Sequence, residues 1–130
     1  MPNWETDLAP RLILGLWHTS FILPARRHLP LLHVTHITKS LSLATHYFAS
    51  HVSGFSVAFP LLLTPEGEAF RQMCLREGKN LGVWTVNHES EMCVAARLGC
   101  TWILTDRPRV WRDLRTEVCR PSFSLRSSPP

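Results

Sequence analysis

The sequence predicts an α/β protein with a parallel sheet. Short apolar runs alternate along the chain with segments of helical periodicity, and the apolar runs end in polar residues. The clearest run is 81–87 (LGVWTVN), which lies between helix-like segments that end at Gly78 and Gly99. Alternating strands and helices imply parallel strands with right-handed crossovers. We therefore expect either an open doubly wound sheet or part of a (β/α)8 barrel, with a site at the carboxyl ends of the strands.

Five strands are expected from short runs of apolar and β-branched residues between turn residues. The first run is predicted to be buried, and it leads into the polar residues His18, Thr19 and Ser20. The expected strands are 11–17 (RLILGLW), 31–37 (LLHVTHI), 54–59 (GFSVAF), 81–87 (LGVWTVN) and 101–106 (TWILTD).

Helices are expected between these strands and after the last one. The best marked has Thr64 as its N-cap, Pro65 at its first position and Gly78 just past its end. Segments 21–28 and 89–98 and a segment that begins at 108 are also predicted to be helical. Ser40 begins a further helix whose apolar residues follow helical spacing, namely Leu41, Leu43, Ala44, Tyr47 and Phe48.

Length limits how much of a barrel the chain can form. A closed (β/α)8 barrel has eight units and typically about 250 residues, whereas this chain has 130 residues and five predicted units. We expect a lead-in over 1–10, a partial barrel domain over 11–118 and a disordered tail over 119–130, which is rich in Ser, Pro and Arg. The fold class expected is thus an incomplete TIM-type barrel.

Composition narrows the partners and the compartment. The net charge of +4 is mild and the basic residues are scattered apart from a cluster between 107 and 115, so no nucleic-acid partner is expected. No apolar run approaches the roughly 18 residues of a membrane span, and the acidic start lacks the basic region of a signal peptide. We expect a soluble cytoplasmic chain whose four cysteines are reduced and mostly packed.

Two groups of residues resemble a known family. The segments 83–87 (VWTVN) and 103–106 (ILTD), with Pro108, resemble the C-terminal signature of the glycerophosphodiester phosphodiesterase family. Segments 11–18 (RLILGLWH) and 64–67 (TPEG) resemble the fungal branch of that family. The resemblance extends over roughly residues 7 to 115, and its W-T-V-N motif is specific only in combination with the later T-D.

The resemblance implies a (β/α)8 barrel that hydrolyses glycerophosphodiesters to an alcohol and glycerol 3-phosphate with a divalent metal, Mg²⁺ or Ca²⁺. By order, the five strands resemble barrel strands four to eight. In the family, the catalytic histidines and the metal-binding carboxylates come mainly from strands one to three, in a His-Arg motif and a Glu-x-Asp motif. No predicted strand of this chain ends in either motif, and Glu89-Ser90-Glu91 lies at a helix start.

Three functional hypotheses follow, and the third and most remote is a small basic interaction protein unrelated to the family. The first is a truncated member of the family, related to phosphoric diester hydrolysis in glycerophospholipid metabolism, which lacks the catalytic residues and the metal ligands and is inactive alone. The second is a non-catalytic module that binds a glycerophosphodiester or phosphate, or that completes a barrel with another chain. The apolar edge strands 11–17 and 101–106 would be unpaired in a five-stranded sheet, so self-association through them is expected.

Candidate site residues follow from the strand ends. Trp84 is expected to line a substrate pocket, with a tryptophan of the barrel core as the alternative, and Thr85 follows it on the same strand. Asn87 would bind substrate or cap the next helix, and Asp106 would orient a site partner or cap the helix that begins at Pro108. His18, after the first strand, would contact phosphate or lie in a surface loop.

His36, in the second expected strand, is predicted to be a packed residue rather than a site residue. Hydrolysis of a phosphodiester needs a general acid, a general base and positive charge near the phosphoryl oxygens. No complete catalytic set and no metal site can be assembled from the residues expected at the strand ends. The sequence therefore predicts substrate-binding residues only, namely Trp84, Asn87, His18, Thr85 and Asp106.

Overall fold

The computed structural model describes residues 3–127, with side-chain exposure as far as residue 117, and contains one five-stranded sheet. The strands are all parallel, and each pairs with the next one along the chain. They are β1 (Ile13–Leu16), β2 (His33–Thr38), β3 (Gly54–Ala58), β4 (Asn80–Trp84) and β5 (Trp102–Ile103).

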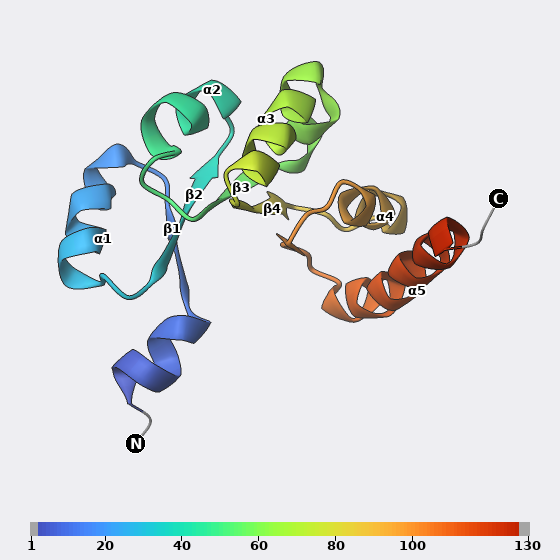
Figure 1. Cartoon of the computed structure of the whole chain (residues 1–130), viewed down its shortest axis with the longest axis horizontal. Coiled ribbons are helices and arrows are strands. Elements are labelled where there is room, and N and C mark those ends of the chain that lie inside the picture. The colour runs from blue at the N-terminus through green and yellow to red at the C-terminus, as the bar shows by residue number, and fades with distance from the viewer. Residues whose placement is uncertain (1–2, 128–130) are drawn as a thin grey trace.

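Helices follow every strand and lie along one side of the sheet, where they form an arc (Figure 1). They are α1 (Ile22–His28), α2 (Leu41–Leu43, continued by a wider helical turn over Ala44–Phe48), α3 (Pro65–Arg76), α4 (Glu89–Arg97) and α5 (Pro108–Ser127). A doubly wound sheet reverses its strand order and places helices on both faces, whereas a barrel keeps sequential order and places them outside. This sheet is therefore a segment of a barrel, as predicted, and it does not close.

The core lies between the sheet and its helices. Phe55 of β3 and Phe70 of α3 meet edge to face, with ring centroids 5.0 Å apart. Aromatic pairs of this geometry add to the stabilisation from apolar burial. Successive side chains of a strand point to opposite faces of the sheet. The strand residues that do not face the helices therefore point to the other, concave face. Further buried members of the core are Phe48, Val57, Leu81, Val83, Val86, Met92 and Ala95.

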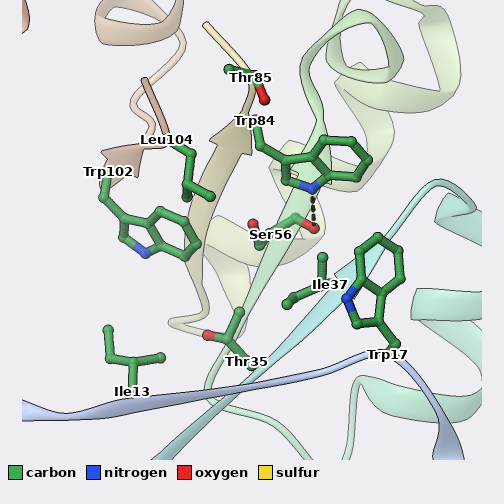
Figure 2. A pocket seen from close by; sticks show the side chains of 10 residues that line it. Ile13, Trp17, Thr35, Ile37, Ser56, Trp84, Thr85, Trp102 and Leu104 are labelled. Carbon is green, nitrogen blue, oxygen red and sulfur yellow. Dashed lines mark hydrogen bonds between the residues drawn. The ribbon is translucent and has the colours of Figure 1, made fainter. Parts of the chain in front are cut away.

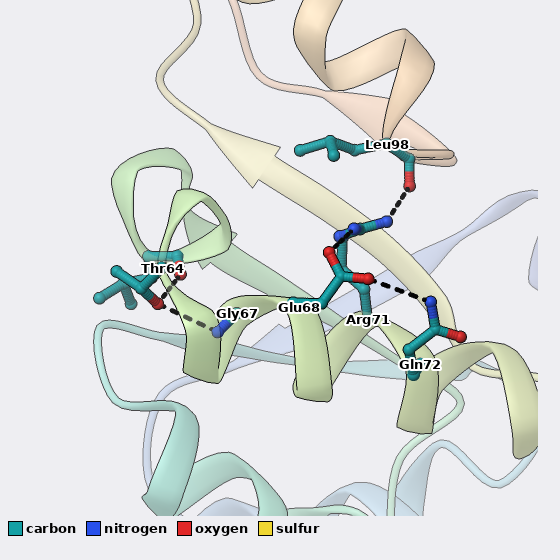
Figure 3. Close-up of polar contacts among 7 residues, drawn as sticks. Thr64, Gly67, Glu68, Arg71, Gln72 and Leu98 are labelled. Carbon is teal, nitrogen blue, oxygen red and sulfur yellow. Dashed lines mark hydrogen bonds and ion pairs between the residues drawn. The ribbon is translucent and has the colours of Figure 1, made fainter.

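Helix α3 has the ends that the sequence predicts. The Thr64 hydroxyl accepts a hydrogen bond from the Gly67 N–H at 3.0 Å (Figure 3), and Gly78 follows the helix with a φ of 64°. On its outer side Glu68 pairs with Arg71, whose guanidinium also donates to the Leu98 carbonyl at 3.3 Å. The last contact fastens α3 to the end of α4.

Helix α2 also begins where it was expected, but its apolar face is narrower. The Ser40 hydroxyl accepts a hydrogen bond from the Leu43 N–H at 3.2 Å, and Ala44 and Phe48 are fully buried. Tyr47 and Leu43, both expected on the apolar face, are 62% and 39% exposed. The short helix contacts the sheet through a narrow row of side chains that includes Ala44 and Phe48, and the side chains of Tyr47 and Leu43 point away from the sheet.

The ends of the chain differ from the expectations in two places. Trp4–Leu8 forms a helical turn capped by Asn3, although the sequence patterns gave no sign of it. Helix α5 extends to Ser127, into the segment expected to be disordered from 119. The boundaries of the lead-in, barrel domain and tail stay predictions. Within 3–127, no helix combines the length and the apolar character that crossing a bilayer requires.

Candidate functional site

A pocket of about 500 Å³ opens on the concave face of the sheet. Figure 2 shows Trp84 and Trp17 at one side of it and Trp102 and Ile13 at the other. Apart from the indole N–H groups of the tryptophans, the polar side chains among the lining residues are those of Thr35, Ser56 and Thr85. In a closed barrel this face is filled by layers of side chains from all the strands. The lower part of the pocket is therefore barrel interior, and its rim at the carboxyl ends of the strands is where a ligand would bind.

Trp84 lies at this rim, and its ring is held in place. The indole Nε1–H donates a hydrogen bond to the Ser56 carbonyl at 3.1 Å, which ties the end of β4 to β3. Trp17 meets Trp84 edge to face, with ring centroids 5.9 Å apart. The ammonium of Lys39 lies 5.8 Å from the Trp84 ring centroid. Thr85 also lines the pocket and is exposed.

Asn87 fastens two loops together. Its side-chain oxygen accepts hydrogen bonds from the Thr105 hydroxyl at 3.1 Å and from the Asp106 N–H at 2.8 Å. Its amide donates to the Asp106 carboxylate at 2.8 Å. Helix α4 begins after His88 and has no side-chain cap. The alternative that Asn87 caps that helix is therefore wrong, and its side chain instead joins the loop after β4 to the loop after β5.

Arg107 strengthens the same junction. Its N–H donates to the Thr105 hydroxyl at 3.0 Å, and its guanidinium donates to the Asn87 carbonyl at 3.2 Å. The guanidinium also lies 3.7 Å from the Glu89 carboxylate, an exposed pair that contributes little to stability. The predicted residues Asn87 and Asp106 are thus brought together with Arg107, but neither lines the pocket that Trp84 and Thr85 line.

The two histidines singled out in the sequence have different surroundings. His18 is exposed, lies 6.3 Å from the Phe21 ring and does not line the pocket. His36 is fully buried and stacks on Phe48 at 3.4 Å, while its Nδ1 lies 3.0 Å from the Leu16 carbonyl. Burial lowers the pKa of His36 from its usual 6.5, although the bond to Leu16 opposes the shift. His36 is a packed residue, as predicted.

Two of the described cysteines, Cys74 and Cys100, are not activated nucleophiles. Cys74 and Cys100 are free thiols, and burial raises the pKa of the Cys74 thiol to about 12 and that of Cys100 to about 11. A cysteine nucleophile reacts as its thiolate. Both thiols stay protonated near neutral pH, so their geometry favours packing over chemistry.

A divalent metal does not fit the described side chains. Among the side chains that the structure describes, as far as residue 117, no group of three or more His, Cys, Asp or Glu could hold a metal ion. Asp106, the carboxylate expected at the strand ends, already accepts a hydrogen bond from Asn87. The chain does contain a Glu-x-Asp spacing at Glu5–Asp7, but it lies in the helical turn before β1 and not at a strand end. Mg²⁺ and Ca²⁺ require several oxygen ligands, which this edge of the sheet does not supply.

Three residues of the rim were not singled out from the sequence: Trp17, Ser56 and Lys39. Trp17 and Ser56 lie on strands or at their ends, where alternation places them on the concave face. Lys39 follows Thr35 and Ile37 in the same alternation. Period-two spacing could have indicated all three residues, but only once the register of the strands was known.

Sequential parallel strands, outer helices and a rim pocket define a barrel-type α/β protein. The chain matches the Glycerophosphoryl diester phosphodiesterase family over residues 4–110, and it therefore belongs to that family. This confirms the family that the sequence motifs resemble. A search of curated proteins finds no match.

Two solved structures share the fold. One, from Silicibacter pomeroyi, is described as a glycerophosphoryl diester phosphodiesterase; it is 21% identical with a TM-score of 0.67, over 86% of this chain and 40% of that one. The other is a glycerophosphodiester phosphodiesterase from Parabacteroides distasonis, 18% identical with a TM-score of 0.71, over 87% of this chain and 46% of that one. This chain thus spans less than half the length of either structure.

Proposed function

We propose that this chain supplies the substrate-lining C-terminal part of a phosphodiesterase barrel and is inactive on its own. The substrate class is a glycerophosphodiester, and the reaction in which the complete barrel takes part is hydrolysis of the phosphoric diester. The observation that supports this most directly is the position of Trp84 and Thr85 of the W-T-V-N motif at the rim of the pocket. Assignment to the fungal branch rests on the resemblance in 11–18 and 64–67, and assignment to barrel strands four to eight rests on the order of the five strands.

The described residues can bind and orient a substrate, but they do not form an acid–base pair. In-line displacement at phosphorus needs a proton donor and a proton acceptor on opposite sides of the reacting group. Asp106 is hydrogen-bonded to Asn87, and His36 is packed behind the sheet. Trp84, Thr85 and Trp17 remain to position the ligand. The proton transfers and the divalent metal of the family would have to come from strands that these residues do not include.

An activity assay tests this proposal. The purified chain, with Mg²⁺ or Ca²⁺ added, should not hydrolyse glycerophosphocholine above the buffer rate. The same chain fused behind a segment with the His-Arg-Gly and Glu-x-Asp strands of a family member should hydrolyse it. Sequencing the genome upstream of Met1 gives an independent check, because such strands encoded there would identify the natural protein as a full enzyme. Robust hydrolysis by the chain alone would refute the proposal.

The second candidate, a module that completes a barrel with another chain, is favoured by the open edges. Ile13 of β1 is 54% exposed, and Leu104, just after β5, is 49% exposed. Both point into the concave pocket, and the outer backbone edges of β1 and β5 pair with no described strand. An apolar sheet edge of this kind favours association with another strand. We therefore propose that the chain self-associates through these edges when no other chain covers them.

A further inference from the structure

We propose that Lys39 is a phosphate anchor at the rim of the pocket, oriented by the ring of Trp84. The ligand is a phosphate monoester or diester whose small alcohol group lies against Trp17 and Trp84. That the alcohol is glycerol rests on the proposed function, whereas the phosphate contact rests on the geometry of Lys39. The ammonium of Lys39 lies 5.8 Å from the centroid of the Trp84 ring, within the range of a cation–π contact.

The strand register places Lys39 on the concave side. Thr35 and Ile37 of β2 both line the pocket, and Lys39 is the next residue in that alternation. Thr38 is level with Val57 of β3, and Val57 is level with Val83 of β4. Lys39, one residue further, is therefore at the level of Trp84, which pairs with Ala58. The lysine and the tryptophan lie at the same height, at the carboxyl edge of the sheet.

The backbone around Lys39 is fixed on both sides. The Thr38 hydroxyl accepts a hydrogen bond from the Ser40 N–H at 2.9 Å and donates to the Ser40 carbonyl at 3.0 Å. These two bonds close the turn in which Lys39 is the middle residue. Trp84 is fixed in turn by its bond to the Ser56 carbonyl. A cation held between a closed turn and an anchored ring loses less conformational freedom when it binds an anion.

The charge of Lys39 is not neutralised by the side chains described. The three ion pairs found within the described residues involve Arg71, Arg107 and Arg112, and no hydrogen bond to Lys39 Nζ occurs there. By contrast, the ammonium of Lys79 donates to the Val52 carbonyl at 2.6 Å. An exposed ammonium with three available donors is a compact binding group for phosphate. Lys39 therefore fits an anionic ligand, and the indole surfaces of Trp17 and Trp84 fit its carbon atoms.

Titration calorimetry of the full chain at low ionic strength tests the anchor. The probes are glycerol 3-phosphate, inorganic phosphate and neutral glycerol, and the variants are Lys39→Met, Lys39→Arg and Arg27→Met. Arg27 is an exposed residue of α1, so its variant has the same net charge as Lys39→Met. We expect Lys39→Met to lower the affinity for both phosphate ligands about tenfold. The affinity of Lys39→Arg should stay within about threefold of wild type, and that of Arg27→Met within about twofold. Circular dichroism checks that each variant is folded, with Lys39→Gln as a second neutral variant.

Several results would overturn the anchor. One is equal affinity of wild type and Lys39→Met for the phosphate ligands. Another is a loss of affinity in Arg27→Met as large as that in Lys39→Met. The third is that wild type binds neither phosphate ligand. A failure of this inference can be told apart from a failure of the proposed function. If the completed barrel hydrolyses glycerophosphocholine but phosphate binding is insensitive to Lys39, only the anchor fails. If binding depends on Lys39 but the completed barrel is inactive, only the proposed function fails.

Discussion

Replacing Asn87 by alanine tests whether this motif residue serves the fold or the ligand. The side chain makes three hydrogen bonds, two to Asp106 and one to Thr105, and all three cross from the loop after β4 to the loop after β5. Strand β5 is short and pairs with β4 over only two positions, Gly82↔Trp102 and Val83↔Ile103. Backbone hydrogen bonds from Thr101 to Leu81, from Leu104 to Val83 and from Val86 to Leu104 flank these two positions. The junction at Asn87 adds three side-chain bonds to this polar attachment of β5 to the sheet.

The cost follows from the number and exposure of these bonds. A net hydrogen bond contributes roughly 0.5–1.5 kcal/mol, and bonds to charged groups contribute more. Asp106 is exposed and Asn87 is half-buried, so water replaces part of what the substitution removes. We therefore expect Asn87→Ala to lower the free energy of unfolding by about 1–2 kcal/mol. The Arg107 bond to the Asn87 backbone carbonyl is untouched, which keeps the loss below the full value.

Urea titration followed by circular dichroism measures this loss. Gln72→Ala is the control, because it removes one hydrogen bond at 3.3 Å on the exposed side of α3, and we expect it to cost at most about 0.5 kcal/mol. A double-mutant cycle with Asp106→Ala should give a coupling energy of at least about 0.5 kcal/mol. The structural role would be refuted if Asn87→Ala lowered the free energy of unfolding by less than about 0.5 kcal/mol and also weakened phosphate binding. That result would show that Asn87 contacts the ligand.

Three further outcomes are expected. Gly67→Ala should lower the free energy of unfolding by about 1–3 kcal/mol in the same titration, because a Cβ there would lie 2.2 Å from the Leu61 carbonyl; unchanged stability would contradict this contact. Because burial lowers the pKa of His36 in the folded chain, neutral His36 contributes stability that is complete above pH 6.5 and is lost as the pH falls below 6.5. Urea titrations at several pH values should show this loss in wild type and not in His36→Asn, and the same pH dependence in both proteins would contradict it. Analytical ultracentrifugation should find wild type self-associated and the Ile13→Lys, Leu104→Lys double variant monomeric, whereas a monomeric wild type would exclude self-association.

The alternation of strands and helices could be predicted because it depends on local signals. Thr64, Pro65 and Gly78 determine the ends of α3 through capping bonds that involve only near neighbours in the sequence. Strand ends were less predictable. The first strand was expected over 11–17 but pairs only over Ile13–Leu16, because a strand ends where its partner's backbone ends. Ile13 and Trp17 were expected to be buried, but an edge strand of an open sheet leaves them exposed.

The site was predictable only in part, for a related reason. Trp84 and Thr85, which line the pocket, could be singled out because they belong to a motif of consecutive residues. The role of Asn87 depends on contacts 18 and 19 residues away in the sequence, and the position of Lys39 depends on the register of three strands. Neither the distant contacts of Asn87 nor the strand register at Lys39 produces a recognisable pattern in the neighbouring sequence. His18 shows the opposite case, since its place after a strand indicated a site, but the turn at Thr19–Phe21 leaves it beside Phe21.

Side chains on the concave face of the sheet already pack in the way that is typical of a filled barrel interior. A Cβ at Gly82 would lie 2.3 Å from the ring of Trp102, and one at Gly15 would lie 2.6 Å from Cδ1 of Ile37. Large side chains thus lie directly over glycines of the neighbouring strands, as small and large residues alternate inside a filled barrel. A sheet adapted to be open to water would not need these close contacts. The glycines therefore indicate a sequence shaped for a covered interior, and this supports the proposal that the chain works against a second set of strands.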